Sequence, residues 1–225
     1  MKRGIALDID ETLSSTLGSW LGEMQKLFGN PENLTLYELI TKYRLAQNVP
    51  YWQTPEAFEW MESKRNDSEY QTIFEPMPGA IDGVLGLNKI IPIYAYLTVR
   101  PEGVYDGTKK WLKKHGFPDA EIIARPNHIP HTDGNQWKAG RLLKLFPEVI
   151  GIVDDNAGLL KFLPKSYKGH VFLYSHKDIP PDSPVNVYAC PDWESVVQKA
   201  KEIFLFVYIL SDHCSRFTVH FYVLK

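Results

Sequence analysis

Short apolar runs rich in branched side chains alternate with longer amphipathic stretches along most of this 225-residue chain. A short apolar run suits a strand buried on both faces, and an amphipathic stretch suits a helix that covers a sheet. The pattern predicts strands at residues 4–9, 91–98, 121–125, 149–154 and 170–175, with a sixth at 185–189. Helices are predicted at residues 81–89, 103–115, 136–146, 157–162 and 192–204. The expected fold class is therefore α/β, with a Rossmann-like parallel sheet flanked by helices.

The stretch from about residue 15 to residue 77 interrupts this alternation between the first two predicted strands. Its amphipathic patterns and proline boundaries predict helices at residues 17–28, 35–46 and 55–63. We therefore expect a small helical cap inserted after the first strand. The expected domains are a discontinuous core over residues 1–16 and 76–202 and a cap over residues 17–75.

An apolar C-terminal extension over residues 203–225 follows the predicted sheet. Its densest part, residues 203–210, is too short to span a bilayer. Three interpretations stay open: a strand or helix extension packed on the core or on a partner subunit, an interfacial anchor, and an unnatural end of the chain. The alternation of Phe217, Val219, Phe221 and Val223 is typical of an edge strand, which would suit a homodimer.

Composition and charge are those of an ordinary globular protein, with 44% hydrophobic residues and a formal net charge of -2. This charge provides no general attraction to a nucleic acid polymer or to an anionic membrane, so a small anionic ligand must be held by local groups. Two cysteines, Cys190 and Cys214, cannot form a disulfide framework and indicate a reducing compartment. The first predicted strand begins at residue 4 and leaves no room for a signal peptide, so we expect a cytoplasmic protein.

Two carboxylates stand at the end of the first predicted strand, at Asp8 and Asp10. A carboxylate at Asp8 can attack phosphorus and bind a divalent cation, while a second one at Asp10 can move a proton. The pair alone is a weak signal, because paired carboxylates are also common in turns and on solvated surfaces. The rest of the chain has to decide between catalysis and a structural turn.

Polar reactive groups also end two later apolar runs, at Thr98 and at Asp154. The carboxyl ends of parallel strands meet at one edge of a sheet, and ligands bind there beside the topological switch point. Lys138 lies on the predicted helix between these strands; Asn135 is the predicted N-cap, which would place Lys138 in the first turn. We therefore expect Asp8, Thr98, Lys138 and Asp154 to converge on one phosphate site.

The charges of these groups predict their roles. A phosphate dianion repels a carboxylate nucleophile, so Mg²⁺ is expected as the cofactor, held by Asp8, Asp154 and the backbone carbonyl of Asp10. Thr98 and Lys138 are predicted to bind phosphoryl oxygens as negative charge is redistributed in the transition state.

Proton transfer falls to Asp10, which is expected to protonate the leaving oxygen and then to deprotonate the water that hydrolyses an aspartyl-phosphate intermediate. Thr12 is expected to orient the turn. Three roles stay open for Asp155: contact with the metal through water, orientation of Lys138, or a purely structural role.

These residues resemble the four motifs of the haloacid-dehalogenase-like superfamily of phosphohydrolases. The resemblance covers residues 1–16 and 76–200 and rests on Asp8-Ile9-Asp10-Glu11-Thr12-Leu13, Leu97-Thr98, Lys138 and Asp154-Asp155. It implies a Rossmann-like core with Asp8 as nucleophile, Asp10 as acid and base, and Mg²⁺ as cofactor. It also implies that the insert is a helical cap that closes over the substrate.

Within that superfamily, the segment Glu75-Pro76-Met77-Pro78-Gly79-Ala80 and the Tyr105 to Trp111 spacing look like the 5'(3')-deoxyribonucleotidases. The subgroup usually has a Ser-Pro pair after its threonine, where this chain has Val99-Arg100-Pro101. Val99 and Arg100 join the predicted phosphate-binding residues, although pairing of Arg100 with a surface carboxylate stays an alternative.

The expected substrate is a small phosphorylated metabolite, and the leading hypothesis is a Mg²⁺-dependent hydrolase of (deoxy)nucleoside monophosphates. In the aromatic-rich cap, Tyr51 and Trp52 are the predicted residues for stacking a nucleobase, with packing inside the cap as the alternative role. A sugar phosphatase is a close second hypothesis. A regulatory module that binds phosphate without turnover is the rival from another class.

Overall fold

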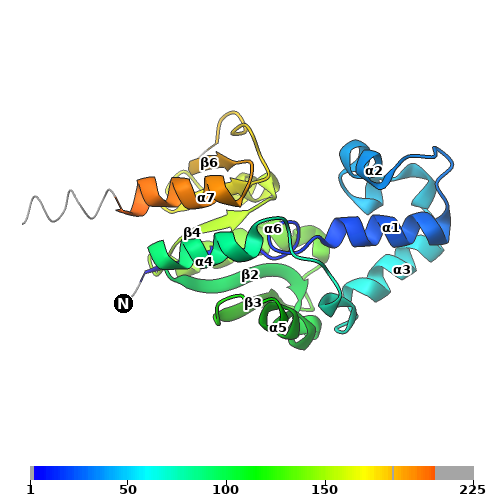
Figure 1. The fold of residues 1–225 in the computed structure, drawn as a ribbon, viewed down its shortest axis with the longest axis horizontal. Helices are drawn as coiled ribbons and strands as arrows, with labels where there is room; N and C mark the ends of the chain where they lie inside the picture. The colour runs from blue at the N-terminus through cyan, green and yellow to red at the C-terminus, as the bar shows by residue number, and fades with distance from the viewer. Residues whose placement is uncertain (1–2, 184, 206–225) are drawn as a thin grey trace, which may run out of the picture.

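A six-stranded parallel sheet forms the centre of the part of the chain that the computed structural model describes, residues 3–183 and 185–205 (Figure 1). The strand order is β3-β2-β1-β4-β5-β6, and each neighbouring pair is parallel. The strands are β1 (Gly4–Leu7), β2 (Ile93–Pro101), β3 (Glu121–Arg125), β4 (Val149–Asp154), β5 (His170–Tyr174) and β6 (Asn186–Cys190). The predicted α/β fold with a parallel sheet is confirmed.

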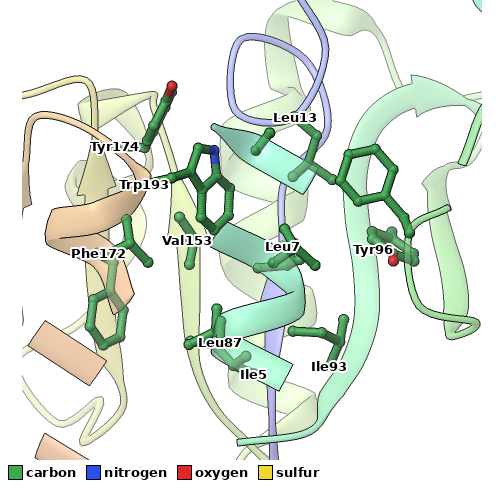
Figure 2. Close-up of a cluster of buried hydrophobic side chains, with 14 of the residues drawn as sticks. Ile5, Leu7, Leu13, Leu87, Ile93, Tyr96, Val153, Phe172, Tyr174 and Trp193 are labelled. Atoms are coloured by element: carbon green, nitrogen blue, oxygen red, sulfur yellow. The ribbon is translucent and has the colours of Figure 1, made fainter. Parts of the chain in front are cut away.

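Helices cover both faces of the sheet because successive side chains of each strand point to opposite faces. On one face, Leu7 packs with buried residues of α4 (Ala80–Ile90), α5 (Tyr105–Lys114) and α7 (Trp193–Ala200), as Figure 2 shows in part. On the other face, Ala6 packs with α6 (Gly134–Leu145) and with a 3₁₀ helix, Ala157–Phe162. The resulting double burial explains why the strands read as continuous apolar runs.

Several element ends differ from the predictions. The residues predicted as a helix at 157–162 form a 3₁₀ helix, which begins with the Asn156 side chain accepting from the Gly158 N–H. The last predicted helix ends as an α-helix at Ala200 and continues as a π-helical turn over Lys201–Leu205. Phe204 in that turn is buried against the core, whereas Cys214 and the rest of the predicted apolar extension, from residue 206 on, lie outside the described residues.

The start of α6 corrects another prediction. The helix begins at Gly134, so Asn135 is not its N-cap and Lys138 lies in the second turn, not in the first. The reason is close packing against β2, since a Cβ on Gly134 would lie 2.3 Å from a methyl group of Val99. Only a glycine allows the helix to begin so near the strand end.

The inserted segment forms a separate helical lobe beside the carboxyl end of the sheet (Figure 1). Its helices are α1 (Thr16–Phe28), α2 (Leu36–Tyr43) and α3 (Pro55–Arg65). Thr35 and Glu38 form a capping box at the start of α2, and Thr54 caps α3. These helices share a buried cluster of their own, so the lobe does not depend on the sheet for its core. Over residues 3–183 and 185–205, none of the helices combines the length and the apolar content that crossing a membrane requires.

Candidate active site

Three of the predicted site residues, Asp8, Asp154 and Lys138, meet near the middle of the carboxyl edge of the sheet. Leu7 of β1 lies in register with Tyr96 of β2 and with Val153 of β4. Asp8 comes directly after Leu7, and Asp154 comes directly after Val153, so the two aspartates stand at the ends of adjacent strands. The strand order changes direction between β1 and β4, which is the switch point where open α/β sheets bind ligands.

Lys138 lies between two of these carboxylates. Its Nζ is 2.8 Å from Oδ1 of Asp8 and 2.8 Å from Oδ2 of Asp154. The side chain of Lys138 is 2% exposed, so these contacts replace water as its partners. The other oxygen of Asp154 accepts the backbone N–H of Asn156 at 2.8 Å. The predicted convergence of Lys138 with Asp8 and Asp154 is therefore present in the structure.

A third carboxylate completes a cluster that is rich in negative charge. Oxygens of Asp8, Asp154 and Asp155 all lie within 4.8 Å of one another. Burial raises the pKa of Asp8 to about 7 despite the attraction of Lys138, and burial together with Asp154 and Asp8 raises the pKa of Asp155 well above its usual range. One lysine does not balance three carboxylates, so a bound cation would relieve their repulsion. Carboxylate oxygens are the ligands that Mg²⁺ prefers, and the donor set therefore fits this ion.

Thr12 joins the loop after β1 to the loop after β4. Its hydroxyl accepts the backbone N–H of Asp155 at 3.1 Å and donates to the Asp155 carboxylate at 3.3 Å. A ring nitrogen of His176 lies 2.8 Å from the backbone carbonyl of Asp155. Asp155 is thus held by its backbone and by its side chain.

Arg100 pairs with Asp10, a partner that neither of the two roles left open by the sequence had named. Its Nη2 lies 2.7 Å and its Nε 3.0 Å from Oδ1 of Asp10. The guanidinium carbon lies over the rings of Phe74 and Trp111, at 5.5 Å and 5.9 Å from their centroids. Thr108 accepts from its Nη1 at 3.4 Å. In this conformation Arg100 binds the predicted acid and base and not a surface carboxylate.

The two oxygens of Asp10 have different surroundings. Oδ1 accepts from Arg100, from the Thr16 hydroxyl at 2.6 Å and from the Ser14 hydroxyl at 3.3 Å. Oδ2 accepts from Nε of Arg100 at 3.1 Å. Burial by itself would raise the pKa of Asp10, but Arg100 and the two hydroxyls hold it below its usual range. Oδ2 is therefore the oxygen better placed for proton transfer.

Glu11 connects the same loop to the cap. Its carboxylate accepts the backbone N–H of Leu17 at 2.5 Å, in the first turn of α1. Burial raises the pKa of Glu11 to about 7, and the nearby Asp10 adds to this effect. Glu11 adopts a φ of 58°, so the chain turns sharply between the sheet and the cap.

Thr98 and Val99 are the other two predicted phosphate-binding residues on β2, and they differ in which of their polar groups already have partners. Thr98 is fully buried, and its hydroxyl oxygen accepts the Arg100 N–H at 3.1 Å, which leaves the O–H proton for another acceptor. The carbonyl of Val99 accepts from Nε of Arg125 at 3.0 Å, and its side chain packs against Gly134. Phosphate binding by Thr98 and Val99 stays a prediction.

The stacking role predicted for Trp52 is wrong in this structure. Trp52 is fully buried in the cap, and its indole N–H donates to the Gly29 carbonyl at 2.9 Å. The ring belongs to the buried cluster of the cap and has no exposed surface on which a nucleobase could stack. Tyr51 is partly exposed and packs edge to face on Trp52 and Tyr43, so its predicted role is neither supported nor contradicted.

Sequence reasoning missed Ser14 and Thr16 as partners of Asp10. Both hydroxyls follow the first motif closely, but at the start of a predicted helix a serine or threonine is expected to serve as a cap. Arg125, which is 5% exposed, was also missed; its guanidinium donates to the carbonyls of Val99 and Ile129 and so connects the loop before α6 to β2. No local pattern distinguishes such an arginine from a surface one.

Comparisons with known proteins support the fold. No protein-family model matches the sequence, and no curated protein matches it. Among solved structures, a Had-superfamily hydrolase from Ehrlichia chaffeensis superposes with a TM-score of 0.50 and 14% identity, over 90% of this chain and 98% of that chain. A dehalogenase superposes with a TM-score of 0.52 and 16% identity, over 87% of this chain and 95% of that chain. Because these identities are low, the likeness concerns architecture, and the chain has the fold of the haloacid-dehalogenase (HAD) superfamily hydrolases.

Proposed function

We propose that this protein is a Mg²⁺-dependent hydrolase of small phosphomonoesters, with (deoxy)nucleoside monophosphates as the first substrate class. The observation that carries the proposal is the position of Lys138, which lies 2.8 Å from both Asp8 and Asp154 inside a buried cluster of carboxylates. A lone lysine between carboxylates can bind an equatorial phosphoryl oxygen while a cation balances the remaining charge.

In the first half-reaction, Asp8 attacks phosphorus and the bond from phosphorus to the leaving oxygen breaks. Lys138 contacts Oδ1 of Asp8, which leaves Oδ2 for the new bond. Asp10 gives its proton to the leaving oxygen. A phosphate dianion bound nearby raises the proton affinity of Asp10 against the effect of Arg100, so the acid form becomes accessible when substrate is present.

In the second half-reaction, Asp10 accepts a proton from water, and the hydroxide attacks the phosphorus of the aspartyl-phosphate. The bond to Asp8 breaks, inorganic phosphate leaves and the Asp8 carboxylate is restored. Thr98 donates its O–H to a phosphoryl oxygen in both steps. Mg²⁺, held by Asp8, Asp154 and the Asp10 carbonyl with Asp155 beside them, would neutralise the charge between nucleophile and phosphate.

Dehalogenation is the competing reaction, since a dehalogenase shares the fold. Displacement of a halide from carbon requires neither an acid for the leaving group nor a cation between nucleophile and substrate. Hydrolysis of the ester intermediate would need one carboxylate as a base for water, but it would explain neither a cluster of three carboxylates nor an acid at Asp10. Phosphoryl transfer accounts for both features.

The test is a release assay over nucleoside monophosphates, sugar phosphates and 2-haloacids, each with Mg²⁺ or with EDTA. We expect Mg²⁺-dependent phosphate release that is lost in Asp8→Asn and retained in Asp106→Asn, a control on the exposed side of α5. Acid-quenched protein from the wild type should carry one phosphoryl group, and Asp8→Asn should carry none.

Each other outcome has a definite meaning. Halide release would overturn the reaction class, and phosphate bound without release would favour a regulatory module. Release from sugar phosphates alone would keep the chemistry and overturn the nucleotide class. The protein is still predicted to be cytoplasmic and to form a homodimer. Sedimentation of the purified protein tests the predicted homodimer.

A further inference from the structure

A tryptophan far along the chain bonds to the loop that carries the two aspartates. Nε1 of Trp193, at the start of α7, donates to the backbone carbonyl of Thr12 at 3.1 Å. Trp193 is 2% exposed and Thr12 is fully buried, so water cannot replace this hydrogen bond. Figure 2 shows the indole nitrogen of Trp193 pointing toward the loop after β1.

The indole is held firmly in its position. A Cβ on Gly83 of α4 would lie 2.6 to 2.9 Å from atoms of the Trp193 side chain, so the ring packs directly on the helix backbone. The centroid of the Tyr174 ring lies 5.6 Å from that of the Trp193 ring. The first turn of α7 is capped by Asp192, whose carboxylate accepts the Ser195 N–H at 2.8 Å. A donor held in this way can orient the group that it binds.

Thr12 connects the Trp193 indole to the carboxylate cluster. Its carbonyl binds Trp193, while its hydroxyl makes both of its hydrogen bonds to Asp155, at 3.1 and 3.3 Å. An unpaired buried carbonyl is costly, and its peptide would turn toward another donor. A turn of this peptide would carry the Thr12 side chain away from Asp155.

We propose that Trp193 is a positioning residue of the cation site, which holds Asp155 beside Asp8 and Asp154 through the Thr12 peptide and hydroxyl. A buried tryptophan also packs the core, but packing requires only the ring. The N–H is the part that acts on the site. This inference rests on the proposed function for the identity of the cation, and it concerns binding rather than turnover.

The experiment is Trp193→Phe, which retains an aromatic ring and removes the N–H. Thermal unfolding of the full chain is followed over a Mg²⁺ titration, and the midpoint of the rise in Tm reports the apparent affinity. We expect about a tenfold loss of Mg²⁺ affinity, since partners that orient metal ligands are worth 10–100-fold in binding. Trp52→Phe is the matched control, because Trp52 is as deeply buried and donates to a backbone carbonyl in the cap.

The control should lose stability in Mg²⁺-free buffer and keep its Mg²⁺ affinity within twofold. If Trp193→Phe behaves in the same way, Trp193 is only a core residue and the proposal is wrong. Gly83→Ala gives a second route when Trp193→Phe does not fold, because its methyl group displaces the indole and should also weaken Mg²⁺ binding.

A double variant tests whether Thr12 is the intermediary. Thr12→Val should weaken Mg²⁺ binding by itself, and Trp193→Phe added to it should cause little further loss. Full additivity would refute the path through Thr12. A wild type that binds Mg²⁺ with these dependences but releases no phosphate would refute the proposed function and leave this inference standing.

Discussion

Replacing Arg100 by methionine is the most informative perturbation of the site, because it removes a charge that is tied to Asp10. Arg100 is 4% exposed at its side chain and Asp10 is 33% exposed, with 2.7 Å between Nη2 and Oδ1. At an effective dielectric constant near 20, this separation corresponds to about 6 kcal/mol of gross attraction. Desolvation of the guanidinium offsets much of it in the wild type.

The net loss in stability is expected to be smaller than the gross attraction. Removing one partner of a buried ion pair costs roughly 3–5 kcal/mol, because the other charge is left buried. Asp10 still has the hydroxyls of Thr16 and Ser14 and partial access to water. We therefore expect about 3 kcal/mol from urea unfolding of Arg100→Met. Lys110→Met, which breaks an exposed pair with Glu69, is the control and should leave the urea midpoint nearly unchanged.

The kinetic result separates positioning from substrate binding. Since general acid and base catalysis contributes roughly 10²–10⁴-fold, a misplaced Asp10 should lower kcat by about a hundredfold and change KM little. Arg100→Lys should recover only part of kcat, because an ammonium cannot reproduce the two-point contact. A large rise in KM with kcat preserved would refute the reasoning and assign Arg100 to the substrate phosphate.

Three further perturbations test other parts of the site. Lys138→Met leaves Asp8 and Asp154 without the lysine that they share, so it should lower the free energy of unfolding by about 3–5 kcal/mol in Mg²⁺-free buffer. Added Mg²⁺ should recover part of the loss. Unchanged urea midpoints would contradict the charge argument. Glu11→Gln should raise Tm at pH 8 and leave it unchanged at pH 4. Burial raises the pKa of Glu11 from 4.5 to about 7 in the folded protein, so ionisation of this side chain destabilises the fold. The destabilisation grows as the pH rises from 4.5 to 7, and glutamine removes it. Gly134→Ala should cost about 1–3 kcal/mol by overpacking against Val99, as measured by thermal unfolding, while Gly140→Ala, which meets open space in the same helix, should not destabilise.

Local sequence was sufficient for the strands and for the candidate nucleophile. Each strand of the sheet is buried on both faces, so the apolar runs were visible without knowledge of their neighbours. The motif around Asp8 and Asp10 is likewise local, and the position of a residue at a strand end is a property of the run itself. Parallel topology then implied that Asp8, Thr98 and Asp154 would lie at one edge.

The ends of helices and the partners of polar side chains could not be predicted from local sequence. The start of α6 depends on contact between Gly134 and Val99, and the burial of Trp52 depends on how the cap helices pack. The partner of Arg100 lies 90 positions away in the sequence, and an arginine after a strand is compatible with a substrate, a surface carboxylate or a buried one. Charge by itself does not choose among them.

The sequence by itself determined the α/β fold and predicted a helical insertion and the candidate positions Asp8, Thr98, Lys138 and Asp154, because periodicity and short motifs are local properties of the chain. Only the tertiary structure decided that Arg100 binds Asp10, that Asp155 stands with Asp8 and Asp154, and that Trp193 reaches Thr12. Each of these pairings joins segments that are far apart along the chain. The physical reason is burial: a polar group that is removed from water must form its hydrogen bond or ion pair with another group of the protein, and only the folded structure determines which group lies within reach.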